Sequence, residues 1–353
     1  MSGETPELFV EVEGKAGRLR LNRPKAIHAL TLDMCHDMSR ALEQWRADPA
    51  VALVMIDHAE GRGFCAGGDI RALADSGAKD GVYARKFFHD EYQLNHQLFT
   101  YAKPVVAFMD GITMGGGVGI SQPARYRVVT ERTMFAMPET GIGLFTDVGG
   151  GWYLSRLPGR TGIFIGLTGA RLDGAECLSL GIATHYVPSE ALDELKAAIA
   201  ADPHSVEALL AKASVTPPPA KIEQNREKID RLFAASRYED ILAALDADDS
   251  EWAKKERATL TGKSPQSAKV SLRLMTQGRD HSDFADEMRV EYDVAARICQ
   301  RHDFLEGVRA LIVDKDNAPK WDPATPEGVT DALIDRIFAP LPEGEAWKPL
   351  NAG

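Results

Sequence analysis

The chain has 353 residues, 44% of them hydrophobic and 26% charged, which is typical of a globular protein with one large domain and an appended part, or with two domains. Its formal net charge of −11 argues against a general nucleic-acid-binding role, because an acidic surface repels phosphates. No apolar run approaches the length that crosses a bilayer, so we expect no membrane partner.

Residues 1–11 are acidic and polar, without the cationic start and apolar stretch of a secretory signal or the Arg-rich character of a transit peptide. We therefore expect a cytoplasmic protein. The four cysteines are scattered without a CxxC pair, which favours buried apolar residues in a reducing compartment over disulfides or a zinc site. HExxH is also absent, and we expect no catalytic metal.

The first half of the chain alternates segments typical of strands with segments typical of helices. Short strands are predicted at 8–12 and 18–21, and Thr31 can cap a helix with an apolar face. Apolar runs at 51–56 and 104–109 are typical of buried parallel strands. Further predicted elements are a helix at 83–101, a helix from about Gly116, and strands at 125–130 and 133–137. This alternation predicts an α/β fold with parallel strands and crossover helices.

Helical periodicity dominates after about residue 188, and the prolines at 217–219 mark a break. Helices are predicted at 220–235, 238–247, 251–260, 264–275, 281–299 and 304–312. The expected organisation is an α/β core at 1–200, a helical C-terminal region at 201–340 and a flexible tail at 341–353.

Two glycine-rich segments each follow a predicted strand and open a predicted helix, at 63–70 and 111–119. Such turns free backbone N–H groups, which can bind an anion or a developing oxyanion. A simple strand-to-helix turn explains the first segment equally well, and close helix packing could explain the second. Neither segment is a P-loop or a GxGxxG match. Together they favour an oxyanion hole built from one N–H of each.

Two carboxylates, Glu139 and Asp147, lie among apolar and glycine residues at 135–151. Acids in such surroundings lose hydration, which raises their pKa and suits them to acid–base catalysis. A helix cap at Asp147 and a surface acid at Glu139 are the structural alternatives, but the pairing favours function. No serine nucleophile elbow (GxSxG) is present.

Taken in order, these segments resemble the crotonase (enoyl-CoA hydratase/isomerase) superfamily from about residue 8 to about residue 321. NRPK at 22–25, through Ala29 and Leu30, is similar to the family's entry motif for the CoA adenine. CAGGD at 65–69 is similar to its first oxyanion loop, and GGG at 115–117 to its second. The resemblance implies a crotonase-like spiral of ββα units with a helical C-terminal region, and a CoA thioester as substrate.

The resemblance places the two oxyanion N–H donors at Gly68 and Gly116. The other substrate contacts that it implies in these loops are Gly67, Gly115, Asp69, Ile70, Ala66, Arg23, Lys25, Ala29 and Leu30. Arg23 and Lys25 are the candidates for binding CoA phosphates. Lys315 and Lys320 are weaker candidates, for which a solvent-facing role is at least as well supported. No separate cofactor is implied, because CoA is part of the substrate.

Hydratases of this superfamily carry two catalytic glutamates, at positions that match 119 and 139 here. Gly119 cannot transfer a proton, so this chain keeps only Glu139 of the two acids. The segments at 91–95, 111–119, 137–140 and 147–151 instead resemble the 3-hydroxyisobutyryl-CoA hydrolase family.

In the hydrolase family, positions that match Glu91, Gly116, Glu139 and Asp147 belong to the substrate site. Two local departures are Thr146, where proline is expected before the aspartate, and His28, where many members have asparagine. The resemblance implies hydrolysis of 3-hydroxyisobutyryl-CoA in valine breakdown, with 3-hydroxypropionyl-CoA as another candidate substrate.

Three questions stay open at this point. Glu139 can act as a general base toward water or attack directly to form an acyl anhydride. An enoyl-CoA hydratase or isomerase is the alternative enzyme, and a non-catalytic binding protein is the alternative outside catalysis. Members of the superfamily often form trimers, so a homo-oligomer is one expectation, but the sequence does not settle the oligomeric state.

Overall fold

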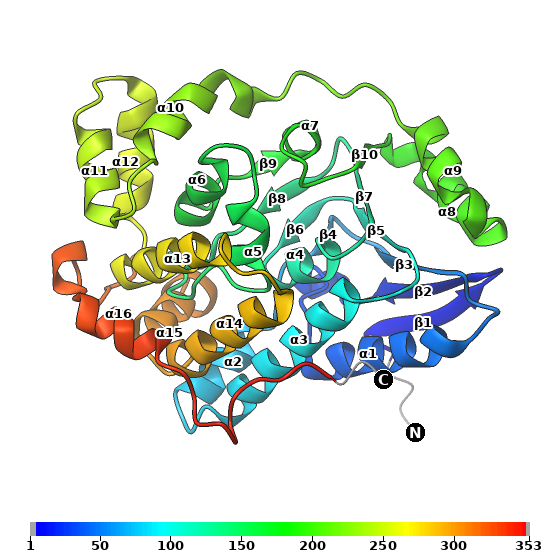
Figure 1. The fold of residues 1–353 in the computed structure, drawn as a ribbon, viewed down its shortest axis with the longest axis horizontal. Helices are drawn as coiled ribbons and strands as arrows, with labels where there is room; N and C mark the ends of the chain where they lie inside the picture. The colour runs from blue at the N-terminus through cyan, green and yellow to red at the C-terminus, as the bar shows by residue number, and fades with distance from the viewer. Residues whose placement is uncertain (1–4, 351–353) are drawn as a thin grey trace. The chain divides into compact units, whose positions relative to one another are not determined.

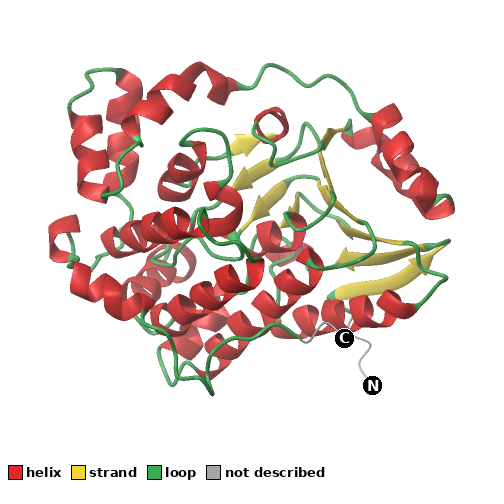
Figure 2. Cartoon of the chain, in the orientation of Figure 1, coloured by secondary structure: helices red, strands yellow, loops and turns green. Residues whose placement is uncertain are grey.

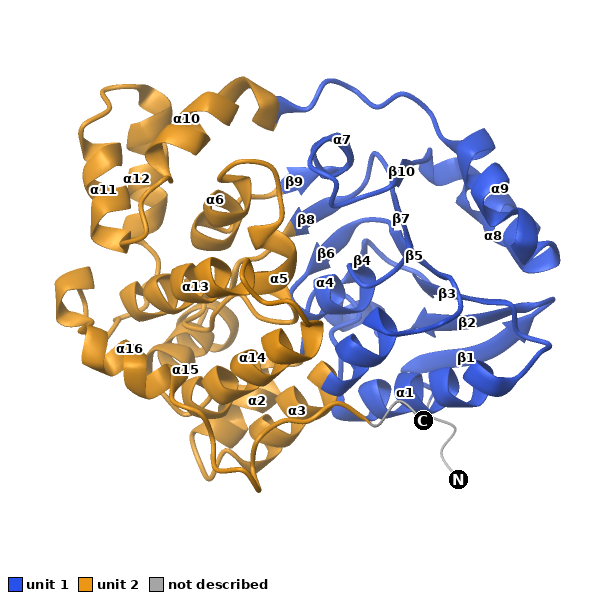
Figure 3. Ribbon diagram, in the orientation of Figure 1, with its two compact units in different colours: residues 1–68, 93–135, 172–221 blue, residues 69–92, 136–171, 222–353 orange. Residues whose placement is uncertain are grey.

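The computed structural model describes residues 5–350, which form two compact units (Figure 3). Unit 1 comprises the described residues of 1–68, 93–135 and 172–221, and unit 2 those of 69–92, 136–171 and 222–353. The units interleave along the chain. The division expected at residue 200 separates the chain by sequence order, whereas these units group residues that lie close in space. The expected division therefore stays a prediction.

Unit 1 is built on a six-stranded sheet whose strands lie side by side in Figure 1. Their order is β1 (Leu8–Glu13), β2 (Ala16–Leu21), β3 (Leu53–His58), β5 (Val105–Met109), β7 (Tyr126–Val129) and β10 (His185–Tyr186). Only β1 and β2 pair antiparallel, and every other neighbouring pair is parallel. The predicted α/β fold with parallel strands is confirmed.

A second sheet of four strands has the order β4 (Gly63–Cys65), β6 (Ile112–Met114), β8 (Met134–Ala136) and β9 (Leu172–Asp173). β4 and β6 pair in parallel, so the chain leaves both strands at the same edge of this sheet. β4 and β6 lie inside the two glycine-rich segments predicted as turns at 63–70 and 111–119, so each turn is shorter than predicted and begins after its strand. The sheet therefore brings together two turns that lie about 50 residues apart in the sequence.

The helices of unit 1 cover its sheet with apolar faces. They are α1 (Leu32–Ala47), α4 (Gly116–Ser121), α7 (Gly174–Ser179), α8 (Leu192–Ala201) and α9 (Val206–Ala213). Thr31 caps α1 by accepting a hydrogen bond from the Met34 amide, as its sequence context predicts. The core packs β3 and β5 against α8, with Met55, Phe108 and Ile199 almost fully buried.

Unit 2 consists almost wholly of helices joined by loops (Figures 2 and 3). They are α2 (Ile70–Gly77), α3 (Val82–Phe99), α5 (Gly150–Ser155), α6 (Thr161–Thr168), α10 (Arg226–Leu232), α11 (Tyr238–Asp246), α12 (Glu251–Thr261), α13 (Pro265–Gly278), α14 (Phe284–Ile298), α15 (His302–Val308) and α16 (Asp331–Phe338). Helix α3 begins in unit 2 and ends in unit 1. No described helix is both long and apolar enough to cross a membrane.

The segment expected to be a flexible tail is anchored in unit 2 by one aromatic residue. Trp347 is fully buried, and its indole N–H donates to the carbonyl of His89 at 3.2 Å. A buried tryptophan removes a large apolar area from water, which offsets the entropy lost in ordering the segment around it. Residues 351–353, the end of the expected tail, lie outside the described residues.

Candidate active site

In unit 1, the two glycine turns approach each other so closely that side chains would interfere. Gly67 has φ +117° and Gly115 has φ +48° with ψ −122°, conformations that L side chains rarely adopt. A Cβ added at Gly67 would lie 3.7 Å from the Gly116 amide nitrogen, an ordinary van der Waals contact, so it is the backbone conformation that favours glycine there. A Cβ added at Gly117 would lie 2.4 Å from the carbonyl oxygen of Cys65, which is too close for any side chain.

The two amides expected to bind an oxyanion are those of Gly68 and Gly116. Gly116 is the first residue of α4, so its N–H has no acceptor within the helix. Gly68 forms an isolated bridge with Leu30, in which the Leu30 amide donates to the Gly67 carbonyl at 2.8 Å. Within residues 5–350, neither the Gly68 nor the Gly116 N–H has a hydrogen-bond acceptor. Both are therefore available to a ligand oxygen.

The segment at 22–30 of unit 1, where the resemblance implies CoA binding, is held by His28, the first of the two departures from the family pattern. The Arg23 amide donates to His28 Nδ1 at 2.9 Å, and His28 Nε2 lies 2.8 Å from the carbonyl oxygen of Glu60. These partners fit a neutral imidazole with its proton on Nε2. Burial lowers the pKa of His28, which agrees with that neutral form. His28 therefore fixes the turn that carries Arg23, Ala29 and Leu30.

The cations predicted to bind phosphate differ in their exposure and in the partners that already engage them. Arg23 pairs with Glu7 at 2.8 Å and donates to the Ala29 carbonyl at 2.5 Å, so its guanidinium is already engaged. Lys25 is exposed on the same turn. Lys315 and Lys320, which belong to unit 2, are exposed as well. Lys25 is thus the better placed of the two motif cations for a ligand phosphate.

Two other predicted substrate residues have a structural role at the start of α2. The Asp69 carboxylate caps this helix by accepting a hydrogen bond from the Ala72 amide at 3.4 Å, and Ile70 is its first residue. Ala66 belongs to the preceding turn in unit 1, where its amide donates to the Ile27 carbonyl at 2.9 Å. Asp69 therefore sets where the first glycine turn ends.

Unit 2 brings three predicted acids together below the protein surface. Glu91 comes from α3, Glu139 opens the 3-10 helix Glu139–Gly141, and Asp147 precedes α5; each is at most 3% exposed. The Tyr92 hydroxyl donates to Asp147 Oδ2 at 2.8 Å. Glu91 Oε1 and Glu139 Oε2 are buried, and neither has a hydrogen-bond partner in the described part of the chain. Unpartnered carboxyl oxygens of this kind are available to substrate or water.

The electrostatics of this acid cluster favour retained protons. Burial raises the pKa of Asp147 to about 7, even though the Tyr92 hydroxyl stabilises its carboxylate. Burial and the charge of Asp147 together hold the pKa of Glu139 well above its usual range. Burial, Asp147 and Glu139 act in the same way on Glu91. A cluster with such pKa values can donate and accept protons near neutral pH.

The turn that carries Asp147 explains the second departure from the family pattern. The Thr146 amide donates to the hydroxyl of Ser271 at 3.0 Å, and the Thr146 hydroxyl donates to the Gly166 carbonyl at 3.3 Å. Proline has no N–H and could not make the first of these bonds. Thr146 therefore links the Asp147 turn to α13 and α6 by hydrogen bonds. A proline at this position would instead restrict the turn through its fixed φ angle.

Sequence reasoning missed three residues of the acid cluster and its surroundings. Tyr92 was predicted only as part of the family segment at 91–95, and Glu287 and Glu291 of α14 were not singled out. Glu291 accepts hydrogen bonds from the Gly149 amide at 2.9 and 3.1 Å. The available signal was weak: both glutamates share the apolar helical face of Phe284, Met288 and Val294.

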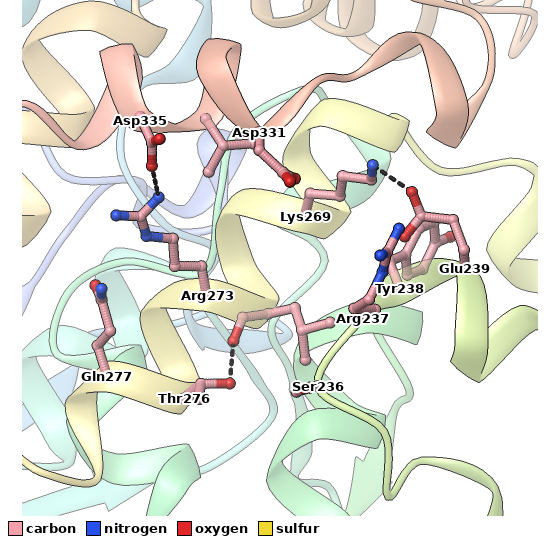
Figure 4. A pocket seen from close by; sticks show the side chains of 12 residues that line it. Ser236, Arg237, Tyr238, Glu239, Lys269, Arg273, Thr276, Gln277, Asp331 and Asp335 are labelled. Atoms are coloured by element: carbon pink, nitrogen blue, oxygen red, sulfur yellow. Dashed lines mark hydrogen bonds and ion pairs between the residues drawn. The ribbon is translucent and has the colours of Figure 1, made fainter.

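A cavity of about 480 Å³ lies elsewhere in unit 2, between residues of α11, α13 and α16 (Figure 4). Lys269 pairs there with Glu239, and Arg273 pairs with Asp335. None of the predicted site residues lines it. Among the described residues no group of three or more His, Cys, Asp or Glu is placed to hold a metal ion, and the expectation of a metal-free site stays a prediction.

Comparison with known proteins identifies what this chain is similar to. The sequence profile of the enoyl-CoA hydratase/isomerase family matches residues 16–338. A zebrafish (Danio rerio) protein named 3-hydroxyisobutyryl-CoA hydrolase, mitochondrial, is 42% identical over 96% of this chain and 90% of its own length. The human (Homo sapiens) protein of the same name is 39% identical over 95% of this chain and 89% of its own length.

These names contradict one expectation from the sequence. The cytoplasmic location expected from residues 1–11 is wrong. The curated relatives that match nearly the whole chain are named as mitochondrial proteins, which points to the mitochondrion. The composition of a short terminal segment is a weak guide to location.

Two solved structures confirm the crotonase-like fold with its helical C-terminal region. A carnitinyl-CoA dehydratase from Mycobacterium thermoresistibile has a TM-score of 0.92 and 42% identity, covering 96% of this chain and 98% of its own. An enoyl-CoA hydratase from Rhodobacter sphaeroides has a TM-score of 0.90 and 36% identity, covering 97% of this chain and 100% of its own. With the profile match and the named relatives, these likenesses show that the chain belongs to the enoyl-CoA hydratase/isomerase family.

Proposed function

We propose that this protein hydrolyses 3-hydroxyisobutyryl-CoA to 3-hydroxyisobutyrate and free CoA, and that it also accepts 3-hydroxypropionyl-CoA. The observation that carries the proposal is the buried pair Glu139 and Asp147 in a chain that has Gly119 at the position of the other hydratase glutamate. Curated relatives with the hydrolase name support it over nearly the full chain. Valine breakdown, a branch of branched-chain amino acid degradation, is the pathway that this substrate implies.

The first catalytic role belongs to unit 1. The thioester carbonyl oxygen accepts hydrogen bonds from the free amides of Gly68 and Gly116, which stabilise the negative charge that develops when the carbonyl carbon is attacked. Each well-placed donor of this kind lowers the barrier by about 3 kcal/mol. The positive φ of Gly67 and Gly115 supports this role, because it aligns the backbone without side chains in the way.

The second role belongs to the acid cluster of unit 2. In its ionised form Glu139 takes a proton from water, and the resulting hydroxide adds to the carbonyl carbon. Alternatively, a Glu139 oxygen adds first, CoA leaves as the thiolate, and water cleaves the acyl anhydride. In either route the C–S bond breaks, and the thiolate is protonated. Asp147, with a pKa of about 7, is the group we assign to that proton transfer, and Glu91 orients the acyl group.

Hydration of an enoyl-CoA is the second candidate, because both solved structures above carry hydratase or dehydratase names. Water addition across a double bond needs one group to activate water and another to protonate the α-carbon. Gly119 leaves the first hydratase position without a titratable side chain. The same oxyanion hole therefore serves hydrolysis better here than it serves hydration.

The most direct test follows free CoA thiol after adding 3-hydroxyisobutyryl-CoA, 3-hydroxypropionyl-CoA or crotonyl-CoA. We expect rapid thiol release from the two hydroxyacyl thioesters and no loss of the crotonyl double bond. Hydration of crotonyl-CoA without thiol release from any substrate would overturn the hydrolase proposal.

The role of Glu139 is tested by Glu139→Gln, which keeps the side-chain volume and removes the base. We expect kcat to fall by about 100- to 10,000-fold, the usual contribution of a general base. Glu239→Gln, in the cavity of Figure 4, is the matched control and should keep wild-type turnover. Near wild-type kcat in Glu139→Gln would remove this residue from the mechanism.

The oxyanion role of Gly116 is tested by comparing two substitutions at the first position of α4. Gly116→Pro removes the amide hydrogen at a position where helices tolerate proline, and Gly116→Ala keeps it. We expect kcat of the proline variant to lie about 100- to 1,000-fold below that of the alanine variant. Equal kcat values in two folded variants, with folding checked by circular dichroism, would mean that this N–H does not bind the oxyanion.

A further inference from the structure

Helix α14 buries two glutamates, Glu287 and Glu291, that the proposed mechanism does not use. They lie one helical turn apart, and both side chains are fully buried. Buried carboxylates are costly unless hydrogen-bond donors or cations compensate them. Their presence on the apolar face of an amphipathic helix therefore needs a specific cause.

The glycine run after Asp147 is shaped around these two side chains. The Gly149 amide donates to both carboxyl oxygens of Glu291. A Cβ added at Gly151 would lie 2.0 Å from Glu287 Oε1, and one added at Gly278 would lie 2.7 Å from Glu287 Oε2. Only glycines at 151 and 278 leave room for the Glu287 carboxyl group. The Asp147 turn and α14 thus fit together through these glutamates.

Glu287 and Glu291 lie one helical turn apart on α14, and the interaction between their carboxyl groups raises the pKa of Glu291. Two ionised carboxylates offer only acceptors, so a hydrogen bond between them requires one proton. Glu287 Oε2 lies 2.7 Å from His281 Nδ1, while Glu287 Oε1 is buried and has no hydrogen-bond partner among residues 5–350. The geometry leaves Glu287 Oε2 paired with His281 and Glu287 Oε1 open to a proton carried by Glu291.

The charges around the pair favour the same assignment. Burial, Glu287 and Asp147 hold the pKa of Glu291 well above its usual range, and its bond to Gly149 only partly opposes them. The hydrogen bond to Glu287 raises the pKa of His281, which favours the charged form of the histidine. Two more titratable groups in the described part of the chain interact with the pair. Tyr92 of α3 interacts with Glu291, and Arg156 after α5 interacts with Glu287.

We propose that Glu287 and Glu291 share one proton, and that the protonated Glu291 is a positioning residue for Asp147. Through the Gly149 amide, Glu291 holds the turn two residues beyond Asp147. By staying neutral, it adds no second negative charge beside that carboxylate. The effect on turnover rests on the proposed function of Asp147, whereas the shared proton does not depend on any activity.

Two substitutions separate the hydrogen bond from the proton. Glu291→Gln keeps an oxygen that accepts from the Gly149 amide and stays neutral, so kcat should remain within about 3-fold of wild type, as expected for a retained geometry. Glu291→Leu leaves the Gly149 N–H without its partner and releases the turn, and kcat should fall about 100-fold. Equal losses in both variants would overturn the positioning role.

The shared proton is tested without activity by infrared spectroscopy of the whole protein at neutral pH. The wild-type minus Glu291→Gln difference spectrum should contain the carbonyl stretch of one protonated carboxylic acid, which shifts in D2O. Glu239→Gln, at an ion-paired acid of the same unit, should give no such band. Absence of the band for Glu291→Gln would overturn the proposal. Its presence in a protein that releases no thiol would leave the pair intact and reject only the hydrolase function.

Discussion

Burial of acidic side chains is the constraint on which unit 2 depends. Glu91, Glu139, Asp147 and Glu291 are each at most 3% exposed, and the groups that favour their charged forms include the Tyr92 hydroxyl, the Gly149 amide and the charge of Lys263 near Glu139. Because no full complement of cations balances them, the charged forms are costly and protons are retained. The glycine run at 149–151 and the Thr146 hydrogen bonds hold the cluster in place. Acid–base chemistry near neutral pH follows from that arrangement.

Local sequence patterns predicted the features of the structure that depend on neighbouring residues alone. The buried strands, the cap at Thr31, the two glycine turns and the unusual setting of Glu139 and Asp147 each depend on a few neighbouring residues. Glu287 and Glu291 could not be found this way, because two of the glycines that contact them, Gly149 and Gly151, belong to a distant segment of the sequence. Trp347 is a similar case: its neighbours look like a frayed end, and its partner is His89 of α3. The interleaved units likewise depend on contacts that sequence order does not reveal.

The named relatives divide between two reactions on one fold. Relatives named as hydrolases and solved structures named as hydratase or dehydratase match nearly the same length of chain. Thioester hydrolysis and enoyl hydration both build negative charge on the carbonyl oxygen, so one oxyanion hole can serve either reaction. The outcome then depends on where titratable groups stand. Here Gly119 removes one from the hydratase position, and in the proposed mechanism Asp147, with its Tyr92 partner, supplies another.

The central claim is that Asp147 is buried at a cost to its charged form. Its native pKa of about 7 lies above the value of about 4 in an unfolded chain. The native state therefore binds more protons than the unfolded state between these pH values, and stability falls as pH rises through that window. The most direct measurement compares the Tm of wild type and Asp147→Asn from pH 5 to pH 8. We expect a shallower decline for Asp147→Asn and a higher Tm than wild type at pH 8. A variant that is less stable than wild type at pH 8, with an unchanged slope, would show that the protein stabilises the carboxylate and would contradict the account.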